Sequence, residues 1–160
     1  MSADKLSKHF DVTLSRTPVK ITPRLTWLGE IPRKLDFENL QSFGIKDGET
    51  AVDMVPDDSA LVYRSEKGLV VITGCSHAGI CNIVEYAKIV CNEDRVVDVI
   101  GGFHLMNPVP KQLEGTIQYL GSLGLEKIHA CHCTDLKSKI ALASVVNIEE
   151  VGVGLELNWS

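Results

Sequence analysis

GLVVITGCSHAGICNI, residues Gly68 to Ile83, is the stretch of sequence that best defines the fold. The apolar run from Leu69 to Thr73 is typical of a buried strand, and the small residues from Gly74 to Gly79 predict a tight turn. Apolar residues with helical spacing begin at Ile80. The stretch therefore predicts strand, turn and helix. It holds His77 just beyond the carboxyl end of the strand, where α/β sheets tend to place ligand and catalytic groups.

Two similar units follow along the chain. His104 and His132 come directly after strands predicted at Val96 to Ile100 and Lys127 to Cys131, and helices are predicted over 111–123 and 136–146. The three histidines, at 77, 104 and 132, are 27 and 28 residues apart, about one strand–helix repeat each. Because neighbouring parallel strands deliver their carboxyl-end loops to one rim, the three imidazoles are expected to converge there. Three protein ligands and a water are typical of a hydrolytic zinc site.

A simpler interpretation applies to any one of these histidines. A single histidine after a strand often only caps or hydrogen-bonds the turn, so the metal hypothesis depends on the threefold recurrence. The two remaining histidines do not fit the pattern. His9 lies in the polar N-terminus, and His129 lies within its strand at opposite parity to His132, so it is expected to point to the other face.

The five cysteines are interpreted as reduced thiols, because their number is odd and no secretion signal is present. Cys131 and Cys133 flank His132 and, with Cys75, could form a structural thiolate site. Cys75 could alternatively be a catalytic thiol before a helix N-terminus, where the helix dipole favours the thiolate. Both alternatives stay open beside the histidine site.

The chain is expected to form a single domain over 1–160. Residues 1–11 are predicted to be a flexible N-terminus, 12–58 to hold edge strands and a long loop, and 59–160 to hold the strand–helix units. Two β-rich runs, Ala60 to Ser65 and Leu69 to Thr73, predict a hairpin, and Val151 to Leu155 suits a final strand. Arg33 lies in the long loop, where it is either a solvated surface residue or a substrate contact.

Composition excludes several classes of protein. The chain has 160 residues, of which 44% are hydrophobic and 23% charged, and a formal net charge of −5. This charge argues against nucleic acid or an anionic membrane as the main partner. No apolar run is long enough for a membrane span, and the N-terminus lacks a signal-peptide core. A cytoplasmic protein is therefore expected.

Several motifs occur together in a characteristic order: Gly29-Glu-Ile-Pro-Arg33, Asp57-Asp58-x-Ala60-Leu61, Gly74-Cys-Ser-His-Ala-Gly-Ile80, Gly101-Gly-Phe-His-Leu105 and His132-Cys133-Thr134. In these motifs the chain resembles the metallo-β-lactamase superfamily. It is most similar to a branch of cytoplasmic hydrolase-like proteins that includes dihydropterin-linked ribofuranosylaminobenzene phosphate synthases.

The resemblance implies an α/β fold, the second half of an αββα sandwich, in which one mixed sheet carries helices on its outer face. It implies that His77, His104 and His132 bind a divalent metal, with zinc preferred. His104 stands where many relatives have a bridging aspartate. Arg33 and Ser76 are expected to contact a small-molecule substrate.

One family motif is absent from the chain. The His-x-His-x-Asp-His signature of the first half of the fold does not occur, and none of the five histidines can replace it. The chain is therefore expected to pair with itself or with a separate polypeptide that carries the first half. The predicted function is that of a C-terminal lobe of a metal-dependent hydrolase, in which metal-activated water attacks a small-molecule ester, with a phosphate ester as one candidate. The alternative is a non-catalytic assembly or regulatory subunit that retains the fold.

Overall fold

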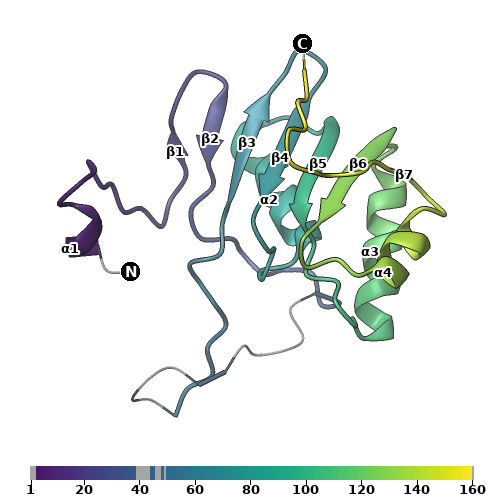
Figure 1. Ribbon diagram of the computed structural model, residues 1–160, viewed down its shortest axis with the longest axis horizontal. Helices are drawn as coiled ribbons and strands as arrows, with labels where there is room; N and C mark the ends of the chain where they lie inside the picture. Colours follow the sequence, from purple (N-terminus) through teal and green to yellow (C-terminus); the bar gives the residue numbers. More distant parts are fainter. Residues whose placement is uncertain (1–2, 39–43, 46–47, 49, 160) are drawn as a thin grey trace.

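One mixed sheet of seven strands forms the centre of the molecule (Figure 1). The computed structural model describes residues 3–38, 44–45, 48 and 50–159. The strands follow one another across the sheet in the order in which they occur along the chain. The first four pair antiparallel: β1 (Val19–Lys20), β2 (Leu25–Trp27), β3 (Ala60–Arg64) and β4 (Leu69–Thr73). The remaining three continue the sheet in parallel with β4: β5 (Val96–Gly102), β6 (Lys127–Cys131) and β7 (Asn147–Ile148).

Three helices connect the parallel strands and cover one face of the sheet: α2 (Ile80–Cys91), α3 (Pro110–Ser122) and α4 (Leu136–Leu142). The core between helices and sheet includes Ile83, Leu120 and Leu142 from the helices and Val71 and Val99 from the strands. The short helix α1 (Ala3–Leu6) lies apart from the sheet (Figure 1). The prediction of an α/β fold with one mixed sheet and helices on its outer face is therefore confirmed. No helix in the described part of the chain is long and apolar enough to cross a membrane.

The hairpin of β3 and β4 has the register expected from its short turn. Ala60 pairs with Thr73 and Arg64 with Leu69, and the Ser65 hydroxyl closes the turn by donating to the Gly68 carbonyl over 2.9 Å. Because Leu69 to Val71 are fully buried, β4 is the central strand from which the parallel half of the sheet grows.

The long loop is attached to the N-terminus of α2 by two side chains. The Glu38 carboxylate accepts hydrogen bonds from the backbone N–H groups of Cys81 (2.9 Å) and Asn82 (2.7 Å). The Asn82 side chain in turn accepts from the N–H groups of Lys34 and Leu35. Residues 34–38 are thereby fixed over the start of the helix, next to the turn that carries His77.

The C-terminal part differs from the sequence prediction. Helix α4 ends at Leu142 and not at Val146, and the last strand is Asn147–Ile148, so the strand predicted over 151–155 is wrong. Val146 turns into the core, and residues 147–148 take the free edge of β6. After β7 the chain, yellow in Figure 1, crosses the sheet face opposite the helices, which we call the open face.

A buried polar group anchors this C-terminal segment. Asp98 of β5 is fully buried on the open face, where its carboxylate accepts from the Trp159 indole N–H (3.1 Å) and bonds His129 Nδ1 (2.9 Å). The Trp159 ring also lies against Tyr63, with the ring centroids 6.5 Å apart. The His129 side chain therefore points to the open face, where it bonds Asp98, and away from the core under the helices.

Candidate metal centre

The loops after β4, β5 and β6 meet at one edge of the sheet, which we call the rim. These three strands are neighbours and parallel, so their carboxyl ends lie side by side. Each loop contains a non-glycine residue in the left-handed conformation: Ser76 (φ 56°), His104 (φ 53°) and His132 (φ 49°). Such residues cost about 1–3 kcal/mol each and concentrate at functional sites. The recurrence seen in the sequence is therefore also a recurrence of backbone geometry.

His77 and His104 lie against each other at the rim. Their imidazole rings meet edge to face, with centroids 4.9 Å apart and planes inclined by 66°. Both side chains are half-buried. Burial lowers the pKa of His104, the nearby His77 lowers it further, and the Asp58 carboxylate opposes the shift. The neutral imidazole, which is the form that binds metals, is therefore favoured at His104.

Asp58 is a rim residue that the sequence reasoning did not select. Its carboxylate accepts a hydrogen bond from the backbone N–H of Ala78 (2.9 Å), in the loop that carries His77. It also acts electrostatically on His104. The available signal was the acidic pair Asp57-Asp58 directly before β3, but its partner lies 20 residues along the chain and only the fold brings the two together.

His132 lies on the same rim but is exposed. Among the described residues, no three or more His, Cys, Asp or Glu side chains are grouped so that they could hold a metal ion. The structure thus brings two of the three predicted ligands together. Imidazole and carboxylate donors suit zinc and related divalent ions, so the donor types at His77, His104 and Asp58 fit a metal, although the described side chains do not complete a ligand set.

Ser76 is held inside the protein. Its side chain is fully buried, and its hydroxyl donates to the Gly102 carbonyl (2.6 Å) and lies 3.0 Å from the Thr73 hydroxyl. These bonds join the ends of β4 and β5. The placement gives Ser76 a role in shaping the rim, whereas its contact with a substrate stays a prediction.

Arg33 is half-buried in the long loop. Its guanidinium donates to the backbone carbonyls of Met54 and Val55 (3.1 Å to the latter). Burial lowers the pKa of Arg33, while Asp58 and Glu30 oppose the shift. Arg33 also lines a cavity of about 510 Å³ together with Arg16, Glu30 and Met54. The cavity offers room for a ligand next to Arg33, and a contact between Arg33 and a substrate remains a prediction.

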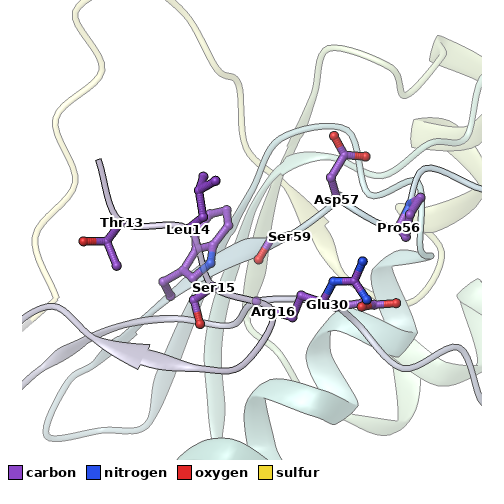
Figure 2. Close-up of a pocket in the computed structure, with 10 residues that line it drawn as sticks. Thr13, Leu14, Ser15, Arg16, Glu30, Pro56, Asp57 and Ser59 are labelled. Atoms are coloured by element: carbon purple, nitrogen blue, oxygen red, sulfur yellow. The ribbon is translucent and has the colours of Figure 1, made fainter. Parts of the chain in front are cut away.

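A second cavity, of about 400 Å³, shares Arg16, Glu30 and Pro56 with the first (Figure 2). Its wall combines apolar, acidic, basic and hydroxyl side chains: Leu14, Arg16, Trp27, Glu30, Asp57 and Ser59. The Ser59 hydroxyl is buried and has no hydrogen-bond partner among the described residues. Asp57 lines the cavity while its neighbour Asp58 bonds the His77 loop, so the cavity and the rim are adjacent.

Gly29 makes this cavity wall possible. A Cβ at this position would lie 2.5 Å from the Arg16 carbonyl oxygen, and the backbone has φ +72°. The same carbonyl accepts a hydrogen bond from the Glu30 N–H (2.9 Å). The N-terminal segment can therefore approach β2 closely only because residue 29 has no side chain.

Two curated proteins from Methanocaldococcus jannaschii are similar to the chain in sequence. The chain is 37% identical over 131 residues to 7,8-dihydropterin-6-methyl-4-(β-D-ribofuranosyl)-aminobenzene-5′-phosphate synthase; the match covers 79% of this chain and 45% of that protein. The chain is 34% identical over 149 residues to a protein described as uncharacterized; the match covers 93% of this chain and 55% of that protein. The chain thus spans about half the length of the curated relatives it matches. No protein-family model matches the chain.

A solved structure shares the fold. It is described as a metal-dependent hydrolase of the β-lactamase superfamily, and it superimposes with a TM-score of 0.79 at 31% sequence identity. The match covers 94% of this chain and 59% of that chain. The sheet, the three covering helices and the rim described above therefore correspond to part of a larger hydrolase fold.

Proposed function

Because the chain belongs to the metallo-β-lactamase superfamily, we propose that it is a lobe of a metal-dependent hydrolase acting on a small-molecule ester. The observation that carries the proposal is the edge-to-face pair of His77 and His104 at the ends of β4 and β5, 4.9 Å between ring centroids. The solved hydrolase with the same fold is described as metal-dependent, which supports a divalent metal here. Zinc is the ion we propose, because neutral imidazole is one of its preferred ligands.

Each rim residue has a defined part in the proposal. His77, His104 and His132 would hold the metal, and Asp58 would keep the His77 loop in place through the Ala78 N–H while adding negative charge beside His104. When bound, the ion supplies Lewis acidity that activates water toward an ester. The buried hydroxyl of Ser76 would keep the loops after β4 and β5 at a fixed separation.

The cavity beside the rim is where we propose that the substrate lies. Arg16 provides a positive charge and Ser59 a hydroxyl group, both suited to a phosphate, while Leu14 and Trp27 provide apolar surface. Arg33 lines the adjoining cavity. The curated relative named as a ribofuranosylaminobenzene phosphate synthase supports a phosphorylated small molecule as the substrate class.

We propose that activity needs a second lobe, supplied by another copy of this chain or by a polypeptide with the first half of the fold. Among the described residues only His77 and His104 are in contact at the rim, and no three potential ligands are grouped, so ligands from a partner would complete the set. The open face supports the same proposal, because Leu61, Ile72 and Ile100 lie on it only half-buried.

The test is metal analysis of the purified full chain after loading with Zn²⁺ and removal of free ion. We expect up to one bound ion per chain and clear loss of binding in His77→Ala. His9→Ala is the matched control, because His9 is an exposed histidine far from the rim in sequence, and it should bind like the parent chain. Equal metal content in His77→Ala and the parent would remove His77 from the ligand set.

Hydrolysis is tested with bis(4-nitrophenyl) phosphate as the probe. The chain alone should show weak or no turnover, and addition of a polypeptide carrying a His-x-His-x-Asp-His motif that co-purifies with it should restore turnover. The alternative function, a non-catalytic assembly subunit, is favoured by the exposed position of His132 away from a completed ligand group among the described residues. A stable complex that binds no metal through this chain would support that alternative.

A further inference from the structure

Two thiols from different loops meet at the rim. Cys75 follows β4 and Cys133 follows β6, and both side chains are half-buried. The Cys133 thiol donates to the Cys75 carbonyl oxygen (Sγ–O 3.2 Å) and accepts from the backbone N–H of His104 (3.2 Å). Gly102 creates the space, because a Cβ there would lie 2.6 Å from Cys133 Sγ. The Cys133 sulfur is thus fixed between the two neighbouring loops.

Residues 75 and 133 are in direct contact, through Cys133 Sγ and the Cys75 carbonyl oxygen. The pKa of Cys133 is raised to about 11, mainly by burial and in part by Cys75, while the hydrogen bond from the His104 N–H opposes the shift. The other three cysteines lack this arrangement. Cys81 is fully buried in α2. Among the described residues, the hydrogen bonds that join two cysteine residues involve Cys75 and Cys133, and not Cys91 or Cys131.

We propose that Cys75 and Cys133 are a redox modification site, which a low-molecular-weight disulfide converts into an intramolecular disulfide across the rim. The bond would connect the loop of His77 to the loop of His132. It would also replace the hydrogen bond that the Cys133 thiol donates to the Cys75 carbonyl. This site is independent of the proposed hydrolase function, because it requires only the two thiols.

The reaction balances without a metal. One thiol of the pair, as the thiolate, attacks a sulfur of the small disulfide, whose S–S bond breaks and releases one small thiolate. The second protein thiolate then attacks the resulting mixed disulfide and releases the other small thiol. Two protein S–H groups are lost and one S–S bond forms, while two electrons reduce the small disulfide to two thiols.

The experiment treats the full, folded chain with oxidised glutathione in the presence of EDTA and then blocks the remaining thiols. Before the blocking step, the intact mass should be two hydrogen atoms below that of the reduced chain, without a lasting glutathione adduct; after it, three blocking groups should be present and not five. Trypsin should release the fragments 68–88 and 128–137 as one linked species that separates on reduction. Circular dichroism of each variant establishes that it is folded.

The fragments each contain a second cysteine, and this provides matched controls. Cys81→Ser and Cys131→Ser should still give the linked species, whereas Cys75→Ser and Cys133→Ser should lose it and retain a glutathione adduct on the remaining thiol. Cys75→Ala is the additional variant, because it removes one thiol of the pair and leaves the contact of Cys133 with His104 in place, whereas Cys133→Ser alters that contact. A linked species that persists in folded Cys75→Ser, or a parent chain that acquires only adducts, would overturn the proposal.

Discussion

The carboxylate of Glu38 connects two parts of the chain that are distant in sequence. It replaces a local cap at the N-terminus of α2, where Gly79 offers no side chain. A Cβ on Gly79 would lie 2.2 Å from Glu38 Oε2, so the glycine and the carboxylate depend on each other. Burial raises the pKa of Glu38, although both backbone hydrogen bonds oppose the shift. The His77 turn is therefore supported by a buried acid from the long loop.

Glu38→Ala should destabilise the protein by about 1–2 kcal/mol at neutral pH, because two N–H groups at the start of α2 lose their acceptor. The folded pKa of Glu38 lies above the ordinary value of 4.5, so raising the pH ionises the unfolded chain first. The advantage of the parent over the variant should therefore be fully present below pH 4.5 and shrink as the pH rises through the folded pKa. Urea denaturation at several pH values measures both effects.

Asp36→Asn is the control for Glu38, since Asp36 lies in the same loop with an exposed ion pair to Lys111. It should leave the urea midpoint unchanged. A Glu38→Ala variant as stable as the parent at every pH would show that the carboxylate does not hold the helix terminus.

Gly102→Ala should disturb the rim more than its small size suggests. The new methyl group would meet Cys133 Sγ at 2.6 Å and the Gly74 carbonyl oxygen at 2.7 Å. We expect a loss of about 1–3 kcal/mol in the free energy of unfolding, as for overpacked interiors. Gly152→Ala is the control, because nothing lies within 4 Å of the position. Equal thermal midpoints for both variants would contradict the close packing at Gly102.

From the sequence, a site residue can be predicted only where a local pattern, such as a position directly after a strand, marks it. His77, His104 and His132 are found because each follows a strand. Asp58 and Glu38 are not found, because each bonds backbone groups 20 or more residues away, and no local pattern encodes that contact. Whether the three histidine side chains meet also depends on the fold: His77 and His104 are in contact, whereas His132 is exposed.

At the scale of elements, the segment after β7 is held to the sheet near its end, by contacts of Trp159. It has no regular structure, and most of its side chains, including Val153, are exposed. Its anchor is the Trp159 indole, which donates to the fully buried Asp98 on the open face. A buried carboxylate requires partners, so this contact serves the stability of β5 as well as the position of the segment.

Trp159→Phe should lower the free energy of unfolding by about 1–2 kcal/mol, because one oxygen of the buried carboxylate loses its donor while the ring keeps part of its packing. Hydrogen exchange of residues 149–158 should accelerate at the same time. Val153→Ala removes a fully exposed side chain from the same segment and should change neither quantity. Unchanged protection in Trp159→Phe would show that the anchor lies elsewhere.

The elements predicted from periodicity agree with the structure where their partners are local or buried. The β3–β4 hairpin and helices α2 and α3 are read from apolar spacing that the fold preserves. The strand predicted at 151–155 fails for a physical reason. Valine and leucine there favour a strand, but residues 147–148 already occupy the edge of β6.

At the scale of the whole molecule, the open face is the surface that we expect to take part in assembly. The C-terminal segment contacts Asp98 on this face through Trp159. Val70, Asp98 and His129 are fully or almost fully buried there, whereas the apolar residues Leu61, Ile72 and Ile100 are only half-buried. Large apolar patches are uncommon on monomers. In layered folds such a sheet face packs against a second sheet.

We therefore expect the chain to associate at micromolar concentration, either with itself or with a polypeptide that supplies the second sheet. Light scattering over a dilution series measures the self-association. Ile72→Glu, on the open face, should weaken it, and Ile89→Glu, exposed on the opposite side in α2, should not. A strictly monomeric chain that also forms no complex with a co-expressed first-half polypeptide would contradict this expectation.

The strand order described above also has a consequence for the order of assembly. Every strand pairs with the next strand along the chain, so the sheet can grow in one direction from the β3–β4 hairpin, one strand–helix unit at a time. Each of these steps closes a loop of moderate length, which favours rapid folding. The pairing of β2 with β3 is the exception, because the long loop separates them. We therefore expect β1 and β2 to join the sheet last, after the rim and its histidines have formed.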